Sequence, residues 1–557
     1  MMGPDQLATA IRTALADAGL PDRQPVLERP KNPEHGDWST NVALTLAGPV
    51  GKPPREIAQM IVDRFAGVEG VQGTPEIAGP GFINFRLATD ALAAIVRAAV
   101  TAGEDVYGRS EVGAGRTANV EFVSANPTGP LHVGHGRWVA TGDAMANLLQ
   151  ATGWAVTREY YLNDAGNQIV LFGASVQALM RGRSAAATDV AGDAGAGADA
   201  VHDVPEDGYK GAYVADIAAA LLASGVDPGD TATVTQRAYE SMVAQIRETM
   251  EAIGIHIDVW FSEQTLHDSG AIDDTIGKLL ADGRAYTADG ATWLRTTEFG
   301  DDKDRVLIKA DGNKTYFAAD TAYLADKVGR GFALAIYLIG ADHHGYVNRL
   351  LAIARAEGVP EGTVEVIIGQ LVNLLRNGQP VRMGKRSGNF VTLDELVEEV
   401  GADAARYTFL RSSMDTPQDF DIARVVSDDK SNPVHYINYS YARIAGIGRK
   451  AAEKAFTPAP LDQADLSLLG HPTELELIRR IDVLPEVVAQ AAVLRAPHRV
   501  ARYAEDLADA FHRFYTECQV IGEDHALSSA RYWLCEATRV SVAVALGLLG
   551  VTPRARM

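Results

Sequence analysis

The stretch from residue 120 to residue 137 constrains the fold most, because it passes from strand to turn to helix within a short span. Val120–Val123 is apolar and β-prone, residues 126–130 read Asn-Pro-Thr-Gly-Pro, and a helical pattern runs from about residue 136 to residue 151. In open α/β sheets, ligands bind at the carboxyl ends of the strands. A helix N-terminus also favours phosphate, through its free N–H groups and its dipole. The stretch therefore predicts a ligand site, suited to phosphate, where this strand ends.

Two histidines, His132 and His135, flank Gly134 at the start of the predicted helix. Two imidazoles in this arrangement can donate hydrogen bonds to phosphate oxygens and stabilise the charge that develops on a five-coordinate α-phosphate. Gly134 has no side chain, so a flat base can approach the backbone closely. The alternative is that both histidines are ordinary surface residues, since His-x-Gly-His also arises by chance. The position between a strand and a helix favours the functional interpretation.

The residues His132-Val-Gly-His135 resemble the HIGH signature of class I aminoacyl-tRNA synthetases. The longer string from Glu121 to Arg137 resembles the arginyl-tRNA synthetases in particular. The resemblance implies an α/β fold class: a Rossmann-like, parallel-sheet class I catalytic domain, a small α+β N-terminal domain and an all-α C-terminal anticodon-binding bundle. The expected domains are residues 1–110, residues 111–420 with an insertion at about 181–300, and residues 421–557.

Composition excludes several other classes of protein. No apolar run reaches the roughly 18 residues of a membrane helix, and the N-terminus lacks the basic-then-apolar form of a secretion signal. The two cysteines, Cys518 and Cys535, are too few for a Cys-rich zinc site or a disulfide framework. We therefore expect a cytoplasmic protein with no membrane partner. We also expect a monomer, although composition does not bear on the oligomeric state. The chain ends close to the family's usual terminus, so we expect a complete protein.

The formal net charge of −21 argues against a nucleic-acid partner, but the charge is unevenly distributed. The excess acid lies in residues 1–432, whereas residues 433–557 contain 14 Lys+Arg and 14 Asp+Glu. A neutral segment with clustered arginines can hold RNA. The charge pattern is therefore compatible with tRNA as a partner, although composition alone does not predict one.

Residues 31–44 and 79–87 resemble the N-terminal extension of arginyl-tRNA synthetases, which contacts the D-loop corner of tRNA. Phe82 and Asn84 lie near the family's base-reading positions, on a predicted strand that can offer an aromatic face and an amide edge to an unpaired base. The resemblance thus implies tRNA contact by Phe82 and Asn84. The alternative is that Phe82 belongs to the core and that Asn84 hydrogen-bonds within a turn.

The middle of the chain alternates between sheet and insertion patterns. Residues 155–168 read as a second strand followed by a turn and a helix, which starts a parallel sheet. Residues 181–204 are rich in Ala, Gly, Ser and Asp and predict a surface excursion, and residues 205–295 predict an insertion with helices around 232–253. The sheet domain is expected to resume near Arg305, with a buried strand at 306–309 and another strand from residue 336.

The family's recognition of arginine uses a tyrosine and an acid at the spacing of Tyr316 and Asp320, which share one face of a helical turn. A guanidinium is planar and always charged, and a buried carboxylate is its natural bidentate partner. Glu121, at the strand end, is a second acid able to reach the same pocket. The plainer interpretation is that Asp320 caps a helix and that Glu121 is a rim charge.

The resemblance assigns the amino and carboxylate ends of arginine to four further residues, which are Ser124, Asn126, His132 and His344. Asp342, His343 and His344 also suggest a metal site. No third histidine or cysteine ligand is nearby in the sequence, so we expect no protein-bound zinc.

The second phosphate element, residues 381–393, resembles the KMSKS loop and departs from it. Arg382 stands in place of the first lysine and Gly384 in place of the first serine, while Met383 is retained and Lys385 matches the second lysine. A lysine on such a loop can close over the β- and γ-phosphates and neutralise charge as diphosphate leaves. Some arginyl enzymes instead carry a lysine three residues before the first signature histidine, where this chain has Gly129. The plainer interpretation is a basic surface loop.

From about residue 432 the pattern changes to long helices, around 436–444, 474–493, 497–520 and 530–549, and predicts an α-helical bundle. Two strings, at 436–443 and 511–520, resemble the anticodon-binding domain of the family. The aromatic residues at helical spacing are expected to be mostly core.

Together these features predict an arginine–tRNA ligase that uses ATP with Mg²⁺, forms arginyl-adenylate and transfers arginine to the terminal adenosine of tRNA(Arg). The family usually requires tRNA for the activation step. One alternative is another HxGH nucleotidylyltransferase, which the C-terminal helices disfavour. A non-catalytic tRNA-binding relative is disfavoured by His132, His135 and Lys385, and a cysteinyl synthetase by the missing zinc ligands.

Overall fold

A five-stranded parallel sheet lies at the centre of the protein, in the order β12-β11-β5-β6-β7. The structure is a computed structural model and describes residues 4–30, 32–189, 204–381, 391–429 and 431–557. The strands are β5 (Thr117–Phe122), β6 (Ala155–Leu162), β7 (Val259–Ser262), β11 (Leu334–Gly340) and β12 (Val364–Gly369). Because the strand order reverses between β5 and β11, a ligand crevice is expected where these two strands end.

Helix α5 (Val133–Ala151) follows β5 directly and is buried over most of its surface. Gly142 lets it lie against β5, since a Cβ at this position would come within 2.2 Å of the Phe122 ring. On the other half of the sheet, α11 (Tyr316–Gly329) precedes β11, and η4 (Ala341–Tyr346) with α12 (Val347–Ala356) joins β11 to β12. The sequence prediction of a strand, a turn and a helix at 120–151 is confirmed.

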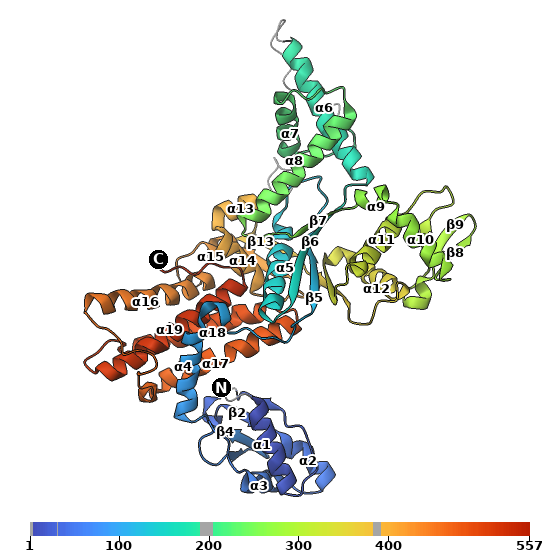
Figure 1. The fold of residues 1–557 in the computed structure, drawn as a ribbon. Coiled ribbons are helices and arrows are strands. Elements are labelled where there is room, and N and C mark those ends of the chain that lie inside the picture. The colour runs from blue at the N-terminus through green and yellow to red at the C-terminus, as the bar shows by residue number, and fades with distance from the viewer. Residues whose placement is uncertain (1–3, 31, 190–203, 382–390, 430) are drawn as a thin grey trace.

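Two lobes project from the sheet (Figure 1), not the single insertion predicted at about 181–300. The first lobe is helical: α6 (Asn167–Asp189), α7 (Ala212–Ala223) and α8 (Thr231–Ala252). The chain then returns to the sheet as β7, so the prediction of one insertion is wrong. β7 has only four residues, all of them partly exposed at the sheet edge, and so short a run has no clear hydrophobic pattern.

The second lobe contains a small antiparallel sheet in the order β10-β9-β8. Its elements are α9 (Gln264–Asp268), α10 (Ala271–Ala281), β8 (Ala285–Ala288), β9 (Ala291–Leu294), η3 (Thr296–Phe299) and β10 (Arg305–Ile308). The strand predicted at 306–309 thus exists as β10, but it does not belong to the parallel sheet and only Leu307 is buried. An apolar run predicts a strand but does not identify its pairing partner.

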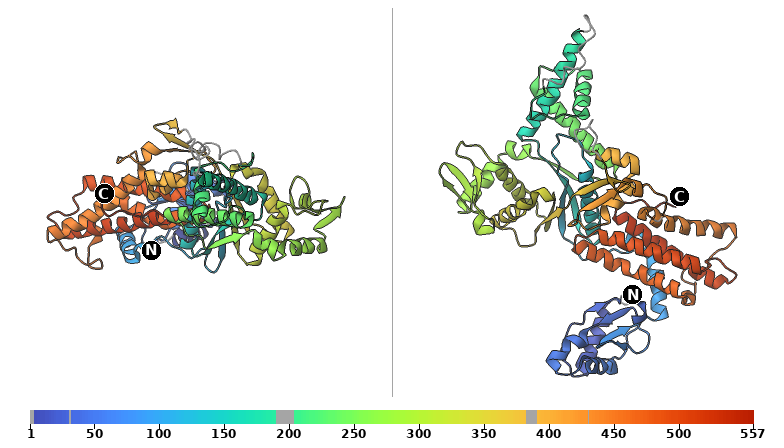
Figure 2. Two further views of the ribbon diagram at one scale, coloured as in Figure 1. Left: turned by 90° about the horizontal axis from the view of Figure 1, so that it is seen from above. Right: turned by 180° about the vertical axis from the view of Figure 1, so that it is seen from behind.

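The N-terminal domain lies at the opposite end of the molecule from α6–α8, as Figures 1 and 2 both show. Its four-stranded antiparallel sheet has the order β1-β2-β4-β3. Its elements are α1 (Pro4–Asp17), β1 (Leu27–Glu28), η1 (Pro33–His35), β2 (Trp38–Thr40), α2 (Val42–Val50), α3 (Pro54–Arg64), β3 (Glu76–Ala78) and β4 (Phe82–Phe85). Helix α4 (Thr89–Val106) then leads the chain to the C-terminal helices and packs against them.

The C-terminal part is an all-α bundle, as the sequence predicted. Its helices are α16 (Pro433–Glu453), η5 (Leu466–Leu468), α17 (Pro472–Val493), α18 (His498–Glu517) and α19 (His525–Leu548). A small sheet and three helices connect it to β12: β13 (Val372–Arg376), β14 (Gln379–Pro380), α13 (Leu393–Val400), α14 (Ala402–Leu410), β15 (Gln418–Asp421) and α15 (Ile422–Val425). Among the residues described, no helix is both long and apolar enough to cross a membrane.

Candidate active site

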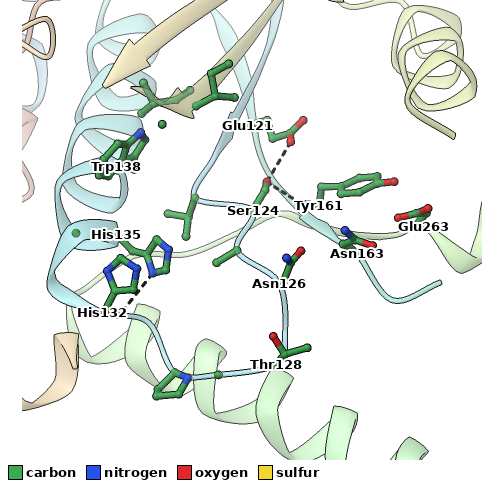
Figure 3. Close-up of a pocket in the computed structure, with 18 of the residues that line it drawn as sticks. Glu121, Ser124, Asn126, Thr128, His132, His135, Trp138, Tyr161, Asn163 and Glu263 are labelled. Carbon is green, nitrogen blue, oxygen red and sulfur yellow. Dashed lines mark hydrogen bonds between the residues drawn. The ribbon is translucent and has the colours of Figure 1, made fainter. Parts of the chain in front are cut away.

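A cavity of about 940 Å³ opens at the carboxyl ends of β5, β6 and β11, next to the start of α5 (Figure 3). The residues around it include Glu121, Ser124, Asn126, Thr128, Gly129, His132, Gly134, His135, Trp138, Tyr161, Asn163, Tyr209, Tyr213, Glu263, Tyr316, Asp320, Leu338, Tyr346 and Leu371. The structure therefore brings together, in one cavity, eight of the residues predicted from the sequence: Glu121, Ser124, Asn126, His132, Gly134, His135, Tyr316 and Asp320.

The backbone turns sharply into this cavity immediately after β5. Val123 and Ser124 both have positive φ, of 69° and 40°, and the Ser124 N–H donates to the carbonyl oxygen of Phe122 at 2.9 Å. A three-residue turn with positive φ is strained, particularly at a β-branched residue, and costs on the order of 1–3 kcal/mol. The Ser124 hydroxyl holds the turn, because it donates to Glu121 (3.0 Å) and accepts from the Tyr161 N–H (3.1 Å).

His132 and His135 stack at the start of α5, with ring centroids 3.7 Å apart. The His132 N–H donates to Nδ1 of His135 at 3.2 Å, so in the neutral ring the proton of His135 resides on Nε2. Burial lowers the pKa of His132, and burial together with the nearby His132 lowers that of His135 to about 3. Both rings are therefore neutral near pH 7, and neutral rings still donate one hydrogen bond each.

Gly134 has a role that the sequence did not reveal. A Cβ at this position would lie 2.8 Å from Cε1 and 2.9 Å from Nδ1 of His132. The missing side chain therefore makes room for the His132 ring.

The last residues of the KMSKS-like element, 391–393, pair with the start of α5. His132 and Thr392 form an antiparallel bridge, Val133 N–H donates to Val391 (3.1 Å), and Leu393 N–H donates to Leu131 (2.8 Å). The loop thus re-enters the described chain beside the two histidines. The predicted residues Met383, Gly384 and Lys385 lie outside the described residues.

The other end of the cavity is acidic. Burial, together with the charges of Glu263 and Glu121, raises the pKa of Asp320 to about 7, although a hydrogen bond from Tyr346 and the charge of Arg349 oppose the shift. Burial also raises the pKa of Glu263, against a hydrogen bond from Tyr161 and the contact with His267, whose Nε2 lies 3.6 Å from Glu263 Oε1. Burial thus outweighs the nearby Arg349 and His267 at these two carboxylates, and a cationic ligand would stabilise their charged forms.

Glu121, by contrast, already has a cation. Its Oε2 accepts from Lys327 Nζ (2.6 Å) and from the Tyr323 hydroxyl (2.8 Å), and Lys327 is 1% exposed. Glu159 lies beside them: burial favours its neutral form, but a hydrogen bond from Arg330 and the charge of Lys327 lower its pKa to about 2. Glu121 thus lines the cavity as part of a neutralised network.

Other predicted residues lie as follows. Asn126 donates to Gln168 (2.7 Å), and Tyr316 is 63% exposed at the first turn of α11. The backbone of His344 lies in η4, and its side chain is outside the described part of the structure.

In the N-terminal domain, Phe82 is partly exposed, whereas Asn84 is buried and accepts from the Ser39 hydroxyl at 2.7 Å.

The sequence interpretation missed Glu263, Tyr161 and Tyr346, which surround the acidic end of the cavity. Glu263 directly follows β7, so it is a strand-end acid like Glu121, and recognising the short β7 would have revealed it. Tyr213 was also missed: it comes from the helical lobe and donates to the Thr128 carbonyl at 3.0 Å. No motif near Tyr161, Tyr213 or Tyr346 in the sequence indicates that these residues reach the cavity.

No group of three or more His, Cys, Asp or Glu side chains suited to a metal ion occurs among the residues described. Chemically, the cavity can accept a cation at its acidic end and phosphate at the start of α5.

Comparison with known proteins agrees with this geometry. Three family profiles match consecutive parts of the chain: "Arginyl tRNA synthetase N terminal domain" at residues 5–87, "tRNA synthetases class I (R), catalytic domain" at 98–431 and "DALR anticodon binding domain" at 437–557. An arginine–tRNA ligase from Frankia alni is 48% identical over 567 residues, which cover 99% of each chain.

The chain belongs to the arginyl-tRNA synthetase family. It is a class I arginine–tRNA ligase, as the sequence resemblance implied, and its partners are arginine, ATP and tRNA(Arg). The other readings of the sequence, a small nucleotidylyltransferase, a cysteinyl synthetase and a non-catalytic relative, are thereby set aside.

Solved structures of the family share the fold of this synthetase. A crystal structure from Campylobacter jejuni, assigned to an arginyl-tRNA synthetase, is 33% identical with a TM-score of 0.75, over 85% of this chain and all of that one. The arginyl-tRNA synthetase of Thermus thermophilus is 22% identical with a TM-score of 0.74 over the full length of both chains. The expected α/β class I fold with its N-terminal and C-terminal domains is confirmed.

Proposed function

We propose that arginine and ATP react in the cavity at the ends of β5 and β11, with the amino acid at the acidic end and the phosphates at the start of α5. The proposal rests on one observation: two carboxylates, Asp320 and Glu263, whose pKa values are raised by burial, line one end of the cavity, and a helix N-terminus with two neutral histidines lines the other. This is the charge pattern that arginine and a nucleotide require.

At the acidic end, Asp320 receives the guanidinium of arginine, and Glu263 contributes a second negative charge. A guanidinium can make two parallel hydrogen bonds to a carboxylate, which a lysine ammonium cannot match. Tyr316 lies four residues before Asp320 on α11 and bounds the same space. Because Glu121 is bound to Lys327, its contribution is to hold Ser124 and the turn rather than to supply the main counter-charge.

The amino and carboxylate ends of arginine are held by Ser124, Asn126, His132 and His344. This leaves the substrate carboxylate directed towards the start of α5, where it attacks the α-phosphate. Both products of that step, arginyl-adenylate and diphosphate, form without an enzyme nucleophile. Positioning of the two substrates and electrostatic stabilisation of the transition state accelerate this step.

The nucleotide lies along the segment from His132 to His135, with its base near Gly134. Neutral imidazoles donate to the phosphate oxygens, and Nε2 of His135 is the available donor of that ring. Lys385, with Met383 and Gly384 beside it, adds the positive charge that offsets the departing diphosphate. Mg²⁺ would arrive with ATP and would offset the negative charge of its phosphates.

The tRNA is expected to contact the N-terminal domain through Phe82 and Asn84, and the C-terminal bundle through its anticodon. For Asn84, this contact requires that the side-chain amide remain accessible to RNA while its Oδ1 accepts the hydrogen bond from Ser39. We propose the domain division 1–110, 111–420 and 421–557, a monomeric enzyme without a membrane partner, and a cytoplasmic location, which suits an enzyme of translation.

ATP–diphosphate exchange with arginine, with and without tRNA(Arg), tests these assignments. Wild type should exchange only with tRNA present, K385A should lose exchange, and D320N should lose it at arginine concentrations that saturate wild type. D326N on the same helix and K52A on the surface serve as matched controls and should keep wild-type rates. Equal exchange by D320N and wild type would contradict the assignment of the acidic end to arginine. Undiminished exchange by K385A would contradict the role of Lys385 at the phosphates.

A further inference from the structure

Arg406, on α14, is the side chain through which three parts of the chain meet. It is 1% exposed. Its Nε donates to the carbonyl oxygen of Leu549 at the end of α19 (3.3 Å), and Nη1 donates to that of Ile253 at the end of α8 (2.9 Å). Nη2 binds the carboxylate of Asp143 on α5. One guanidinium therefore ties the C-terminal bundle and the helical lobe to the helix that begins with the two histidines.

Asp143 and its neighbours extend this connection. Its Oδ1 accepts from Arg158 Nε at 2.9 Å. Asn147, one turn along α5, donates to the carbonyl oxygen of Leu548 at 3.3 Å and accepts from Arg158 at 2.6 Å. The end of α19 is thus bound to α5 directly through Asn147 as well as through Arg406.

The end of α19 is shaped to admit the Arg406 guanidinium. Gly550 has a φ of +67°, and a Cβ at this position would lie 1.8 Å from Nη2 of Arg406. Any larger residue at position 550 would displace the guanidinium from its partners.

A second buried arginine, this time on α5, binds the segment that follows α14. Arg137, on α5, donates to the carbonyl oxygens of Ser413 (2.6 Å) and Thr416 (2.8 Å), in the loop that follows α14. Helix α5 is therefore clamped near its start by Arg137 and further along by Arg406.

Hydrophobic contacts alone would fill this space, but they fix geometry poorly because they have no preferred direction. A guanidinium with several carbonyl and carboxylate partners sets both distance and orientation. Asp143 lies 11 residues after His132, about 16 Å along the helix axis. A helix this long and this buried moves as a unit, so a displacement at Asp143 reaches the histidines.

We infer that Arg406 is a positioning residue for arginine activation: it sets where His132 and His135 lie relative to the bundle on which the anticodon is read. The inference rests on the proposed role of these two histidines. It concerns the placement of α5 and not contact with any substrate.

Two variants test this inference, one by changing Arg406 itself and the other by changing the space around its guanidinium. R406K keeps the charge but loses the planar set of donors, and G550A leaves Arg406 intact but pushes its guanidinium away. G19A is the control for G550A, because Gly19 also ends a helix with a φ of +67° but has no atom within 4 Å of the added Cβ. The measurements are the fraction of active sites by adenylate burst, kcat and KM for tRNA-dependent exchange, tRNA(Arg) binding, and thermal unfolding.

Positioning predicts that R406K and G550A both lose about 10- to 100-fold in kcat per active site, since misplacement of about 1 Å has effects of this size. KM for ATP and arginine and the affinity for tRNA should stay within about threefold of wild type, and G19A should keep its kcat. If folded R406K and G550A both have wild-type kcat per active site, the inference is wrong and Arg406 serves stability alone. If R406K does not fold, G550A decides between these outcomes. Loss of exchange in wild type would instead refute the proposed function.

Discussion

The imidazole rings of His132 and His135 lie face to face, with centroids 3.7 Å apart and 23° between their planes. Two protonated rings at this separation would repel one another, so the arrangement requires that at least one stays neutral. Burial ensures this for His135 in particular. The pair is therefore suited to donate hydrogen bonds to phosphate over the whole neutral pH range.

The buried His135 should make the protein less stable in mild acid. Its pKa is about 3 in the folded protein and about 6.5 in an unfolded chain. Between these values only the unfolded chain binds the proton, so the stability is complete above pH 6.5 and falls as the pH decreases. We expect that H135N, which cannot titrate, loses about 2 kcal/mol less free energy of unfolding than wild type between pH 7 and pH 5. Urea unfolding at both pH values measures this, and equal losses would contradict the assignment.

Asp320 should make arginine binding depend on pH. Its pKa of about 7 in the empty cavity means that a proton must leave before the carboxylate can pair with a guanidinium. KM for arginine should therefore rise as the pH falls below 7, by up to about tenfold per pH unit. D320N should show a KM at least about 100-fold higher, with no such rise. A parallel pH dependence in the two proteins would place the titrating group elsewhere.

The same residue should reduce stability. The folded-state pKa of Asp320 lies above the unfolded value, so its ionisation disfavours the folded state increasingly as the pH rises from about 4 to 7. D320N should therefore be more stable than wild type, by about 4 kcal/mol at pH 8 and by less at pH 5. Denaturant titrations at the two pH values provide the comparison. A D320N protein that is less stable at pH 8 would show that the charge of Arg349 outweighs the effect of burial on Asp320.

Gly134 should be required for activity but not for stability. Alanine is intrinsically better in a helix than glycine by about 1 kcal/mol, but its Cβ would meet the His132 ring. G134A should therefore lose at least about tenfold in the rate of exchange with little change in melting temperature. G277A, in α10 with open space around it, should keep full activity. Normal exchange by G134A would mean that the His132 ring can move without consequence.

Lys327 should be among the most sensitive buried positions. K327M would remove the cation that Glu121 and Glu159 share, and breaking a buried ion pair costs about 3–5 kcal/mol. K52M removes an exposed pair with Glu56 and should cost less than about 1 kcal/mol. Urea unfolding of the two variants tests the contrast, and similar losses would show that water or a conformational change compensates for the missing Lys327.

Much of the site could be predicted from short segments of sequence. The strand, turn and helix around His132 are encoded locally, and Tyr316 and Asp320 share a helix face because of their spacing. Likewise, the four C-terminal helices follow from the 3.6-residue period of their apolar residues. Such features depend on residues a few positions apart, so the sequence alone determined them.

Only the tertiary structure decided which distant residues complete the site. Glu121 meets Lys327 across 206 positions of the chain, and Glu263 joins Asp320 because the four-residue strand β7 returns to the sheet. Arg406 connects α5, α8 and α19 for the same reason. Local patterns specify elements, but which elements become neighbours, and how far burial shifts their charges, is set by the packing of the whole chain.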